Sequence, residues 1–561
     1  MYRRTLILKN DTMWLKCHYH DREIAKSIPG YRYLKQHQAW EYPLLPDTLS
    51  QLQVVFPNLE VDPPVFVAVE SIKQQRDAVT QAKDAGWENA EPIKPMPIKV
   101  KPFRHQILGY NIMLSLPHSA LLMEQGCGKT LTTVAAAGRW FLDGEIERVL
   151  VVAPSSVVSV WPTEFSLYAD FPVDVLVLDH SSVAKRIDAL SSWEENREAL
   201  QVAVINYEAV WRMEEELSGW KPDLVVADES QRIKTPGSKQ SKAMHRLGRK
   251  AKRRVILTGT PVTQGPLDFF SMYKFLDPRI FGNNFYSFKS RYAILVRRDS
   301  FTQVVGYQNI DELVRKAHSI AFRVTKDEAL DLPEIMDQNL YCNMEPKAMQ
   351  LYWQMAQDSV MELENGKVTA RNILTQLLRL SQLTGGFAGD FYTEGIKQVS
   401  NAKFKLLAEV VDDLYSAGKK VVIFARFRPE IALIENFLAE KGEYAVVHGD
   451  VPKDERGLEV KRFQEDPNCM GFLAQLQTAG LGLTLHAAST AIFYSLDFSY
   501  ANYGQCKARI HRIGQHHPCT YVHLLAKGTI DTKVMRILNR KKSVADDIVD
   551  NWKSYFFKEN D

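Results

Sequence analysis

Two arginines near the carboxyl end of the chain have the type and spacing that suit a phosphate. The segment Gln505–Gln515 holds Arg509 and Arg512 three residues apart, so on a helix both would project from one face. Guanidinium groups are always charged and can donate two parallel hydrogen bonds to phosphate oxygens. By itself the segment could equally be an ordinary basic helix, so its interpretation depends on residues elsewhere.

A candidate phosphate loop lies far upstream, where an apolar run ends in glycines and a helix-compatible stretch follows. Its residues are Gly126, Cys127, Gly128, Lys129 and Thr130. The glycines let backbone N–H groups approach phosphate oxygens, the lysine reaches the β- and γ-phosphates, and the threonine hydroxyl can ligate Mg²⁺. Met123 replaces the first glycine of the longer pattern, so the short Gly-x-Gly-Lys-Thr form predicts ATP and Mg²⁺ as cofactors.

Two carboxylates follow another apolar run, Leu224–Ala227, which is typical of a buried parallel strand. Asp228 would hold Mg²⁺ directly or through water, and Glu229 would activate the attacking water as general base. The alternative is a solvated acidic strand end. A further strand leads into Thr258, Gly259 and Thr260, which can lie beside the carboxylates and respond to the state of the phosphate. Together these segments predict an ATPase.

In order along the chain, the segments resemble the motifs of helicase superfamily two, and more narrowly the Swi/Snf family of ATP-dependent double-stranded DNA translocases. The segments are Phe103–Gln106, Glu124–Thr130, Asp228–Lys234, Leu257–Pro261, Gln505–Gln515 and Gly528–Asp531. The chain departs from the family at Ala508, where many members have an acidic residue, and at Gln477, where many have threonine or serine. The departures put the DNA contacts of the segment after Gln477 in doubt.

The resemblance implies roles for residues that spacing alone does not assign. Gln106 would recognise the adenine and Phe103 would pack on it. Arg509 and Arg512 would complete the ATP site of the first lobe only when the cleft between two lobes closes, which ties hydrolysis to movement. The residues expected to couple hydrolysis to movement are Thr258, Gly259, Thr260, Gly482 and Gln505.

Polar residues that follow apolar strands are the candidate DNA contacts, because hydroxyl and backbone N–H groups at strand ends can meet phosphates. In related translocases the matching segments touch the DNA backbone, mainly one strand of the duplex. The candidates are Pro154, Ser155, Ser156, Asn206, Tyr207, Gly449, Asp450 and Thr478. Each could equally be an ordinary turn or helix cap.

Apolar strands alternate with helical stretches in two regions of the chain, which predicts an α/β fold with two RecA-like parallel-sheet lobes. We expect helical insertions between the lobes and a small α+β domain at the amino end. A proline-rich linker, Glu91–Pro97, marks the first boundary. The expected domains are residues 1–95 (accessory), 96–285 (lobe 1), 286–400 (helical insertion) and 401–561 (lobe 2).

Composition bounds these expectations without deciding between them. The 561 residues carry a net charge of only +3, so nucleic-acid binding cannot be argued from global charge. The six cysteines contain no Cys-x-x-Cys pair, and Cys17–His20 fits an alternating strand better than a metal site. No apolar stretch reaches the ~18 residues of a membrane span, and no secretory pattern is present. We therefore expect an intracellular protein, cytoplasmic or nucleoid-associated.

The leading hypothesis is a DNA-dependent ATPase that translocates on double-stranded or forked DNA and remodels DNA or protein–DNA complexes, with unidentified protein partners. A strand-separating superfamily two helicase and a non-catalytic scaffold are the alternatives. Segments Ile28–Tyr33 and Trp40–Pro43 weakly resemble the HARP-type module of annealing helicases, which recognise branched DNA. A plain accessory domain with a core tryptophan explains them equally well.

Overall fold

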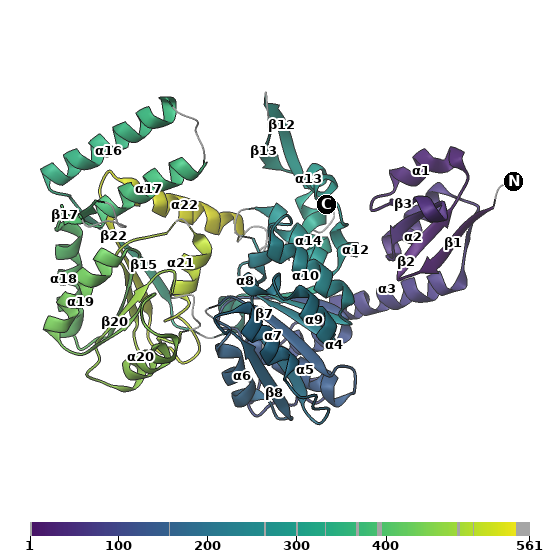
Figure 1. Ribbon diagram of the computed structural model, residues 1–561, viewed down its shortest axis with the longest axis horizontal. Helices are drawn as coiled ribbons and strands as arrows, with labels where there is room; N and C mark the ends of the chain where they lie inside the picture. Colours follow the sequence, from purple (N-terminus) through teal and green to yellow (C-terminus); the bar gives the residue numbers. More distant parts are fainter. Residues whose placement is uncertain are drawn as a thin grey trace. The chain divides into compact units, whose positions relative to one another are not determined.

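The structure is a computed structural model that describes most of the chain. The described residues are 3–155, 157–262, 265–298, 301–330, 332–365, 370–389, 395–478, 483–497 and 499–545. Contacts divide them into one unit that holds the residues up to Thr325 and a second unit, Lys326–Val544 (Figure 1).

The amino-terminal domain of the first unit is built on a five-stranded sheet of order β3-β4-β2-β1-β5. Its elements are β1 (Arg4–Lys9), β2 (Thr12–Lys16), α1 (Arg22–Ser27), β3 (Arg32–Leu34), β4 (Ala39–Pro43), α2 (Pro46–Val55), β5 (Leu59–Val61) and α3 (Pro63–Asp84). Leu6, Met13, Leu15, Trp40 and Tyr42 form its buried core. The domain is therefore α+β, as predicted.

The Cys17–His20 segment is not the expected strand. It leaves β2 and enters a single 3₁₀ turn, η1 (Tyr19–Asp21), because the buried Asp21 carboxylate accepts two hydrogen bonds from Arg4, at 2.8 and 2.9 Å. Among the described residues, no three His, Cys, Asp or Glu side chains are grouped as a metal site.

Lobe 1 of the first unit is a seven-stranded sheet of order β14-β6-β11-β10-β7-β9-β8, and all its neighbouring strands are parallel. The strands are β6 (His118–Met123), β7 (Arg148–Ala153), β8 (Val173–Leu178), β9 (Leu200–Asn206), β10 (Leu224–Asp228), β11 (Arg253–Leu257) and β14 (Ala321–Val324). The helices before β11 are α4 (Arg104–Ser115), α5 (Lys129–Leu142), α6 (Val160–Tyr168), α7 (Val183–Ser191), α8 (Tyr207–Val210), α9 (Glu214–Trp220) and α10 (Lys239–Lys250). Because the carboxyl ends of parallel strands meet at one edge, Asp228 and Asn206 lie at the same edge of the sheet.

The region after β11 is less purely helical than predicted. Its helices are α11 (Phe269–Leu276), α12 (Pro278–Phe281), α13 (Phe285–Tyr292), α14 (Ile310–His318), α15 (Lys326–Ala329), α16 (Pro346–Asn365) and α17 (Ala370–Thr384). It also holds the antiparallel pair β12 (Ala293–Arg298) and β13 (Phe301–Tyr307), seen as a projecting hairpin in Figure 1. It gives β14 to the edge of one sheet and β15 (Ile335–Cys342) to the edge of the other. The sequence does not mark these strands, because β14 is short and β15 is largely exposed.

The second unit contains lobe 2, a six-stranded sheet of order β15-β22-β21-β18-β20-β19 with parallel neighbours throughout. Its further strands are β18 (Val421–Ala425), β19 (Tyr444–Val447), β20 (Gly471–Gln475), β21 (Thr490–Phe493) and β22 (Cys519–Ala526), with a short pair β16 (Phe387–Ala388) and β17 (Lys397–Gln398) beside them. Its further helices are α18 (Ala402–Ser416), α19 (Arg428–Lys441), α20 (Lys453–Glu465), α21 (Tyr500–Lys507) and α22 (Ile530–Ala545). Two buried apolar clusters include side chains of alternate positions of β18, such as Val422 in one and Ile423 in the other. The predicted fold of two parallel-sheet lobes is confirmed.

Helix α3 joins the amino-terminal domain to lobe 1. It packs on α4, and the Lys83 ammonium donates a 2.6 Å hydrogen bond to the His318 carbonyl. Burial lowers the pKa of Lys83 to about 7. Beyond the helix, the Trp87 ring meets Phe322 of β14 at 6.4 Å between centroids. The predicted boundary near residue 95 therefore follows a helix that already contacts lobe 1.

Among the described residues, no helix has both the length and the apolar character that a membrane span requires.

Candidate functional site

The predicted phosphate loop connects β6 to the first residue of α5, Lys129. Gly126 and Gly128 have φ angles of 90° and 88°, in the left-handed region that favours glycine. A Cβ on Gly128 would lie 2.1 Å from the Gln106 amide nitrogen. The glycines are thus required both by backbone conformation and by a close neighbour, and the loop presents backbone N–H groups at a helix amino end, where anions bind.

Gln106 is attached to this loop by its side chain. Its Oε1 accepts a 3.0 Å hydrogen bond from the Phe103 backbone N–H, and its Nε2 donates to the Cys127 carbonyl at 3.2 Å. The buried His105 ring meets the same carbonyl at 2.9 Å. Sequence reasoning missed His105, whose only signal was its position inside the Phe103–Gln106 segment. Phe103 is 45% exposed and available to pack on a base, and the adenine contact of Gln106 stays a prediction.

Lys129 and Thr130, the first two residues of α5, differ in the contacts of their side chains. The Lys129 ammonium donates to the Met123 and Glu124 carbonyls at 2.9 and 3.4 Å. The half-buried Thr130 hydroxyl makes no hydrogen bond within the described part of the chain, which leaves it available as a ligand.

Asp228 ends β10 in a buried position between three donors. The Trp161 indole N–H donates to its Oδ2 at 3.1 Å, the Glu229 backbone N–H to its Oδ1 at 2.9 Å, and the Tyr207 hydroxyl to its carbonyl at 2.8 Å. Burial and the nearby Glu229 charge raise the pKa of Asp228 to about 7, although Lys129 and Trp161 act in the opposite direction. A divalent cation would relieve this unfavourable pair of charges.

A chain of hydrogen bonds runs from Glu229 to the Thr258–Thr260 segment. The Gln231 amide donates to the Glu229 carboxylate at 2.8 Å and accepts from the Thr258 hydroxyl at 2.8 Å. The Thr258 hydroxyl in turn accepts from the Thr260 N–H at 3.0 Å. A Cβ on Gly259 would lie 3.1 Å from the Gln125 backbone nitrogen, so this segment also approaches the phosphate loop. The predicted proximity of these residues to the carboxylates is thus seen in the structure.

The residues present fit ATP with Mg²⁺. Both polar atoms of the Gln125 amide and the Thr260 hydroxyl are buried without hydrogen-bond partners in the described structure, beside the loop. Mg²⁺ needs only one or two carboxylates when phosphate oxygens and water supply the other ligands. Asp228 and Thr130 match that requirement, so a site with a single carboxylate is sufficient.

Arg509 and Arg512 are not on a helix, which corrects the expectation from their spacing. Helix α21, which carries Gln505, ends at Lys507, and the arginines follow in successive turns. The Leu485 N–H donates to the Arg509 carbonyl at 3.0 Å, and the Arg512 guanidinium donates to the Leu483 carbonyl at 3.3 Å, so both arginines contact the segment that precedes β21. Arg509 is buried and Arg512 is half-buried.

The remaining family segments of lobe 2 have structural roles. The Gln515 amide donates to the Ala488 carbonyl at 2.9 Å and accepts from the His516 and His517 N–H groups, both at 3.0 Å. Asp531 forms a buried ion pair of 2.6 Å with Lys403 of α18. These contacts hold the turn segment and α22 against the lobe.

The predicted DNA contacts form two groups, one in each lobe, and Tyr207 is an exception. The first group lies at the ends of the neighbouring strands β7 and β9. Ala153, the last residue of β7, pairs with Asn206, the last residue of β9, and Pro154 and Ser155 follow Ala153 along the chain. Tyr207 does not fit the expectation, because its side chain is fully buried and its hydroxyl is bound to the Asp228 carbonyl. We therefore assign its side chain to the support of the ATP site.

The second group lies in lobe 2 around Gln475, the last residue of β20. The Gln475 Oε1 accepts from the Gly449 N–H at 3.2 Å and from the Thr478 hydroxyl at 3.5 Å. Asp450 is exposed and paired with Arg428. Ser156 and Gly482 lie outside the described residues.

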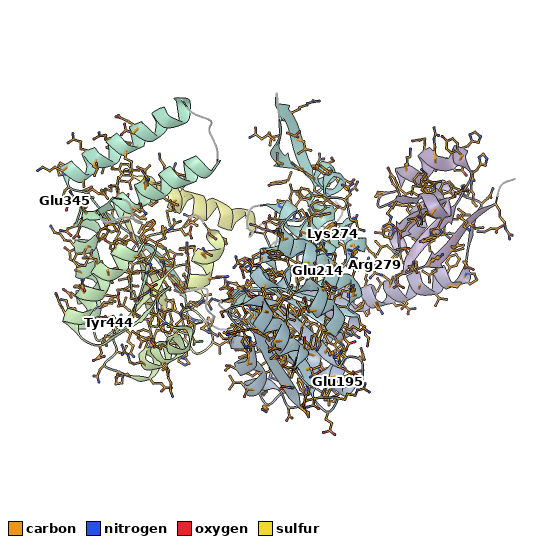
Figure 2. The ribbon with its side chains drawn as sticks, in the orientation of Figure 1. Glu195, Glu214, Lys274, Arg279, Glu345 and Tyr444 are labelled. Carbon is orange, nitrogen blue, oxygen red and sulfur yellow. The ribbon has the colours of Figure 1, made fainter. Side chains whose placement is uncertain are left out.

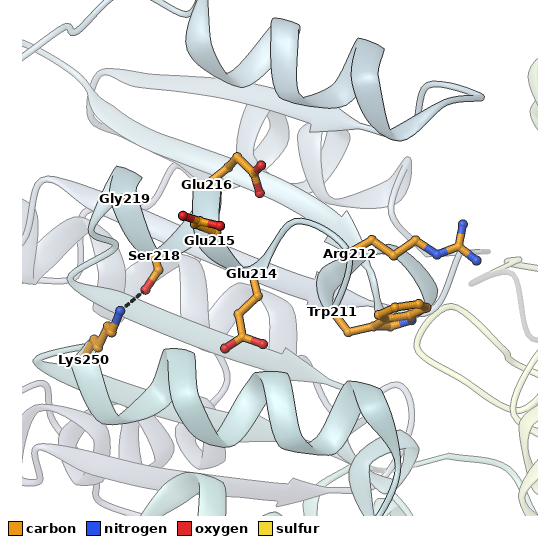
Figure 3. A pocket seen from close by; sticks show the side chains of 8 residues that line it. All are labelled: Trp211, Arg212, Glu214, Glu215, Glu216, Ser218, Gly219 and Lys250. Atoms are coloured by element: carbon orange, nitrogen blue, oxygen red, sulfur yellow. Dashed lines mark hydrogen bonds between the residues drawn. The ribbon is translucent and has the colours of Figure 1, made fainter.

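A pocket of about 680 Å³ lies beside α9 in lobe 1 (Figure 3). Its lining residues are Trp211, Arg212, Glu214, Glu215, Glu216, Ser218, Gly219 and Lys250. Three of the lining residues are glutamates and none belongs to the phosphate loop, so the pocket is separate from the predicted phosphate site.

Comparisons with known proteins match two domain families to the chain. The SNF2-related domain family matches residues 105–385, and the helicase conserved C-terminal domain matches residues 402–514. A DNA repair and recombination protein RAD54-like of Drosophila persimilis is 27% identical over 474 residues, which are 76% of this chain and 60% of the relative. The DNA repair and recombination protein RDH54 of Saccharomyces cerevisiae (strain JAY291) is 27% identical over 437 residues, 72% of this chain and 46% of the relative. The chain thus spans about half to three-fifths of the length of these curated relatives.

Among solved structures, the Sulfolobus solfataricus SWI2/SNF2 ATPase core in complex with dsDNA is 25% identical. The match covers 83% of this chain and 97% of the solved chain, with a TM-score of 0.40.

The two parallel sheets and the two domain matches define the class, a protein of helicase superfamily two with an SNF2-related domain and a helicase conserved C-terminal domain. Within that class, the chain belongs to the SNF2-related, or Swi/Snf, family.

Proposed function

We propose that the protein hydrolyses ATP in response to duplex or forked DNA, translocates along the duplex, and so remodels DNA structures or protein–DNA complexes. The observation that carries this proposal is the hydrogen-bonded connection from Glu229 through Gln231 to Thr258, beside the phosphate loop. The names of the relatives, DNA repair and recombination proteins, support DNA as the partner.

In the proposed reaction each side chain has one task. Lys129 binds the β- and γ-phosphates, Thr130 and Asp228 hold Mg²⁺, and Glu229 accepts the proton of the attacking water. Mg²⁺ would supply electrostatic stabilisation of the transferring phosphoryl group. Arg509 and Arg512 would act on that group when lobe 2 closes on lobe 1, a contribution of roughly 10³–10⁵ in rate for a positioned arginine.

ATP hydrolysis tests this function directly. Turnover is measured without nucleic acid and with duplex DNA, single-stranded DNA, forked DNA or RNA, at two salt concentrations because phosphate contacts are salt-sensitive. We expect stimulation by duplex, strongest with forks. Stimulation by single strands or RNA alone would refute the proposal and favour a conventional helicase.

Two variants test the site residues in the same assay. Lys129→Ala and Glu229→Gln should each reduce turnover by about 10² or more, because they remove a phosphate ligand and the general base. Duplex binding measured by fluorescence anisotropy should stay within a few-fold of wild type. Retained turnover in both variants would disprove the site assignment.

We also propose that the amino-terminal domain recognises DNA structure. Tyr19, Tyr31 and Tyr33 are exposed on it, and Arg22 lies over the Tyr19 ring at 4.3 Å. Exposed aromatic rings beside guanidinium groups are the surface on which unpaired bases stack. This surface supports a preference for forked over plain duplex DNA.

A further inference from the structure

Four polar side chains of lobe 1 meet at the carboxyl edge of the sheet. Ser155 follows β7, Asn206 ends β9, and Glu208 lies in α8 directly after it. Arg232 belongs to η3 (Ser230–Ile233), the 3₁₀ turn that follows β10. Since β7 lies between β9 and β10 in the sheet, three separate connections bring these residues together.

Three of the four side chains donate to the Glu208 carboxylate. The Ser155 hydroxyl and the Asn206 amide donate to Oε2 at 3.1 and 3.0 Å, and the Arg232 guanidinium donates to Oε1 at 3.2 Å. Arg186 orients the Asn206 amide by donating to its Oδ1 at 2.8 Å. The donors therefore form a ready-made site for one oxyanion, and the Glu208 carboxylate occupies it.

This site is open to solvent, and two arginines, Arg232 and Arg186, contact it. The Glu208 and Arg232 side chains are 51% and 49% exposed. Burial opposes the charge of Glu208, but hydrogen bonds to its carboxylate and the Arg232 charge outweigh that effect and lower its pKa. The Arg186 guanidinium lies beside the cluster as a second positive charge, since it is hydrogen-bonded to the Asn206 side chain. Lys239 and Arg212 both lie over the Trp211 ring, at 4.3 and 5.1 Å.

We propose that the Glu208 carboxylate occupies the site of a DNA backbone phosphate. When duplex DNA binds, the phosphate displaces the carboxylate and accepts the hydrogen bonds of Ser155, Asn206 and Arg232. A phosphate carries the same charge as the carboxylate and accepts from the same donors. The ion pair that the phosphate would replace is exposed and therefore weak, so the exchange is easily reversed. This inference rests on the proposed function, because it names the contact through which the duplex acts.

The same exchange reaches the ATP site through η3. The Arg232 backbone N–H donates to the Glu229 carbonyl at 3.0 Å, and the neighbouring Gln231 holds the Glu229 carboxylate and the Thr258 hydroxyl. Arg232 on the outside and Gln231 on the inside are thus consecutive residues of one short turn. A phosphate that draws Arg232 away from Glu208 changes the position of Gln231, and with it the orientation of the general base.

The test compares Glu208→Gln with Glu195→Gln in the full chain. Glu195 is a matched control, because it also pairs with an arginine of lobe 1, Arg148, at 3.0 Å. Arg148 begins β7, whereas Ser155 follows its end, so the control lies at the opposite edge of the sheet (Figure 2). Both variants change the net charge equally. Binding of a labelled blunt duplex is measured by anisotropy, and ATP turnover is titrated with the same duplex.

We expect Glu208→Gln to bind the duplex roughly fivefold more tightly than Glu195→Gln, because a competing anion is removed. Damage to the fold would weaken binding and cannot produce this gain. Arg232→Gln should weaken binding, reduce the slope of log affinity against log salt by about one, and lower the ratio of DNA-stimulated to DNA-free turnover.

Equal affinities of Glu208→Gln and Glu195→Gln, or weaker binding by Glu208→Gln, would overturn the exchange. An unchanged stimulation ratio in Arg232→Gln would overturn its link to the ATP site. If the duplex binds the wild-type protein but does not stimulate its ATP turnover, both the proposed function and the link from Arg232 to the ATP site are refuted. The anisotropy comparison of Glu208→Gln with Glu195→Gln still tests the exchange of Glu208 for phosphate.

Discussion

The Gln231 side-chain amide donates a 2.8 Å hydrogen bond to the Glu229 carboxylate, so the proposed general base is held by a neighbour two residues away. Glu229 itself has a φ angle of 47°, in the left-handed region that residues other than glycine seldom adopt. The position of the base therefore depends on the Thr258 contact of Gln231 as well as on the strand that carries Glu229.

Replacing Gln231 by alanine should lower kcat by roughly tenfold to hundredfold, because a misoriented base loses part of the ~10²–10⁴ contribution of general base catalysis. The KM for ATP should change little, since no phosphate ligand is removed. Steady-state ATP turnover at saturating duplex measures both constants. Gln308→Ala is the control, because within the described part of the chain that exposed amide donates to the Ser290 carbonyl alone, at 3.2 Å. Equal kcat values in the two variants would contradict the role of Gln231.

ATP turnover at limiting Mg²⁺ should fall as the pH falls below about 7. Burial raises the pKa of Asp228 to about 7, above the ordinary carboxyl value, so a growing fraction is protonated below that pH and cannot hold the metal. Added Mg²⁺ should restore the rate, because metal and proton compete for the same oxygens.

Trp161→Phe separates this effect from the titration of ATP itself. The Trp161 N–H bond lowers the pKa of Asp228, so its loss should move the acid limb of the profile to higher pH. The nucleotide is identical in both experiments, and only the protein group can cause a difference. Superimposable profiles would show that Asp228 is not the group responsible.

Asp531→Ala should destabilise lobe 2 by about 3–5 kcal/mol, because it leaves the buried Lys403 ammonium without its partner. The Lys403 side chain is only 2% exposed. Urea denaturation followed by circular dichroism measures the change. The control is Lys441→Met, which breaks the exposed Lys441–Asp412 pair and should cost at most about 1 kcal/mol. Similar midpoints for the two variants would rule out a stabilising role of the buried pair.

The double variant Tyr31→Ala/Tyr33→Ala should reduce the preference for forked over plain duplex DNA while retaining duplex-stimulated turnover. Each stacked base is worth about 1–3 kcal/mol on an aromatic ring, so the preference should fall by roughly tenfold or more. Competition binding with forked and plain duplex measures it. Val54→Ala, an exposed apolar change in the same domain, serves as control. An unaltered fork preference would count against this surface.

These point variants are a better test than deletion of residues 1–95. Deletion removes α3 and Trp87, and uncovers the surface around His318 and Phe322 that they contact. A loss of activity after deletion would therefore report damage to lobe 1 as readily as a loss of DNA recognition.

Local patterns were sufficient for the elements that carry the ATP site. The glycines around Cys127, the acidic pair at Asp228 and the threonines at 258 and 260 each follow an apolar run, and a buried parallel strand needs such a run. The sequence by itself therefore determined the two-sheet fold class, the order of the motifs and the family.

Tertiary structure decided the features that depend on pairing between distant segments. Trp161 donates to Asp228, which lies 67 residues away in the sequence, and Arg232 donates to Glu208, which lies 24 residues away. No periodicity in the sequence predicts such contacts. Arg509 has the spacing of a helical residue, yet its carbonyl is taken by the Leu485 N–H and the helix ends before it. Spacing records only the preference of the local backbone, whereas a side chain's partners are set by the segments that the sheet brings to the same edge.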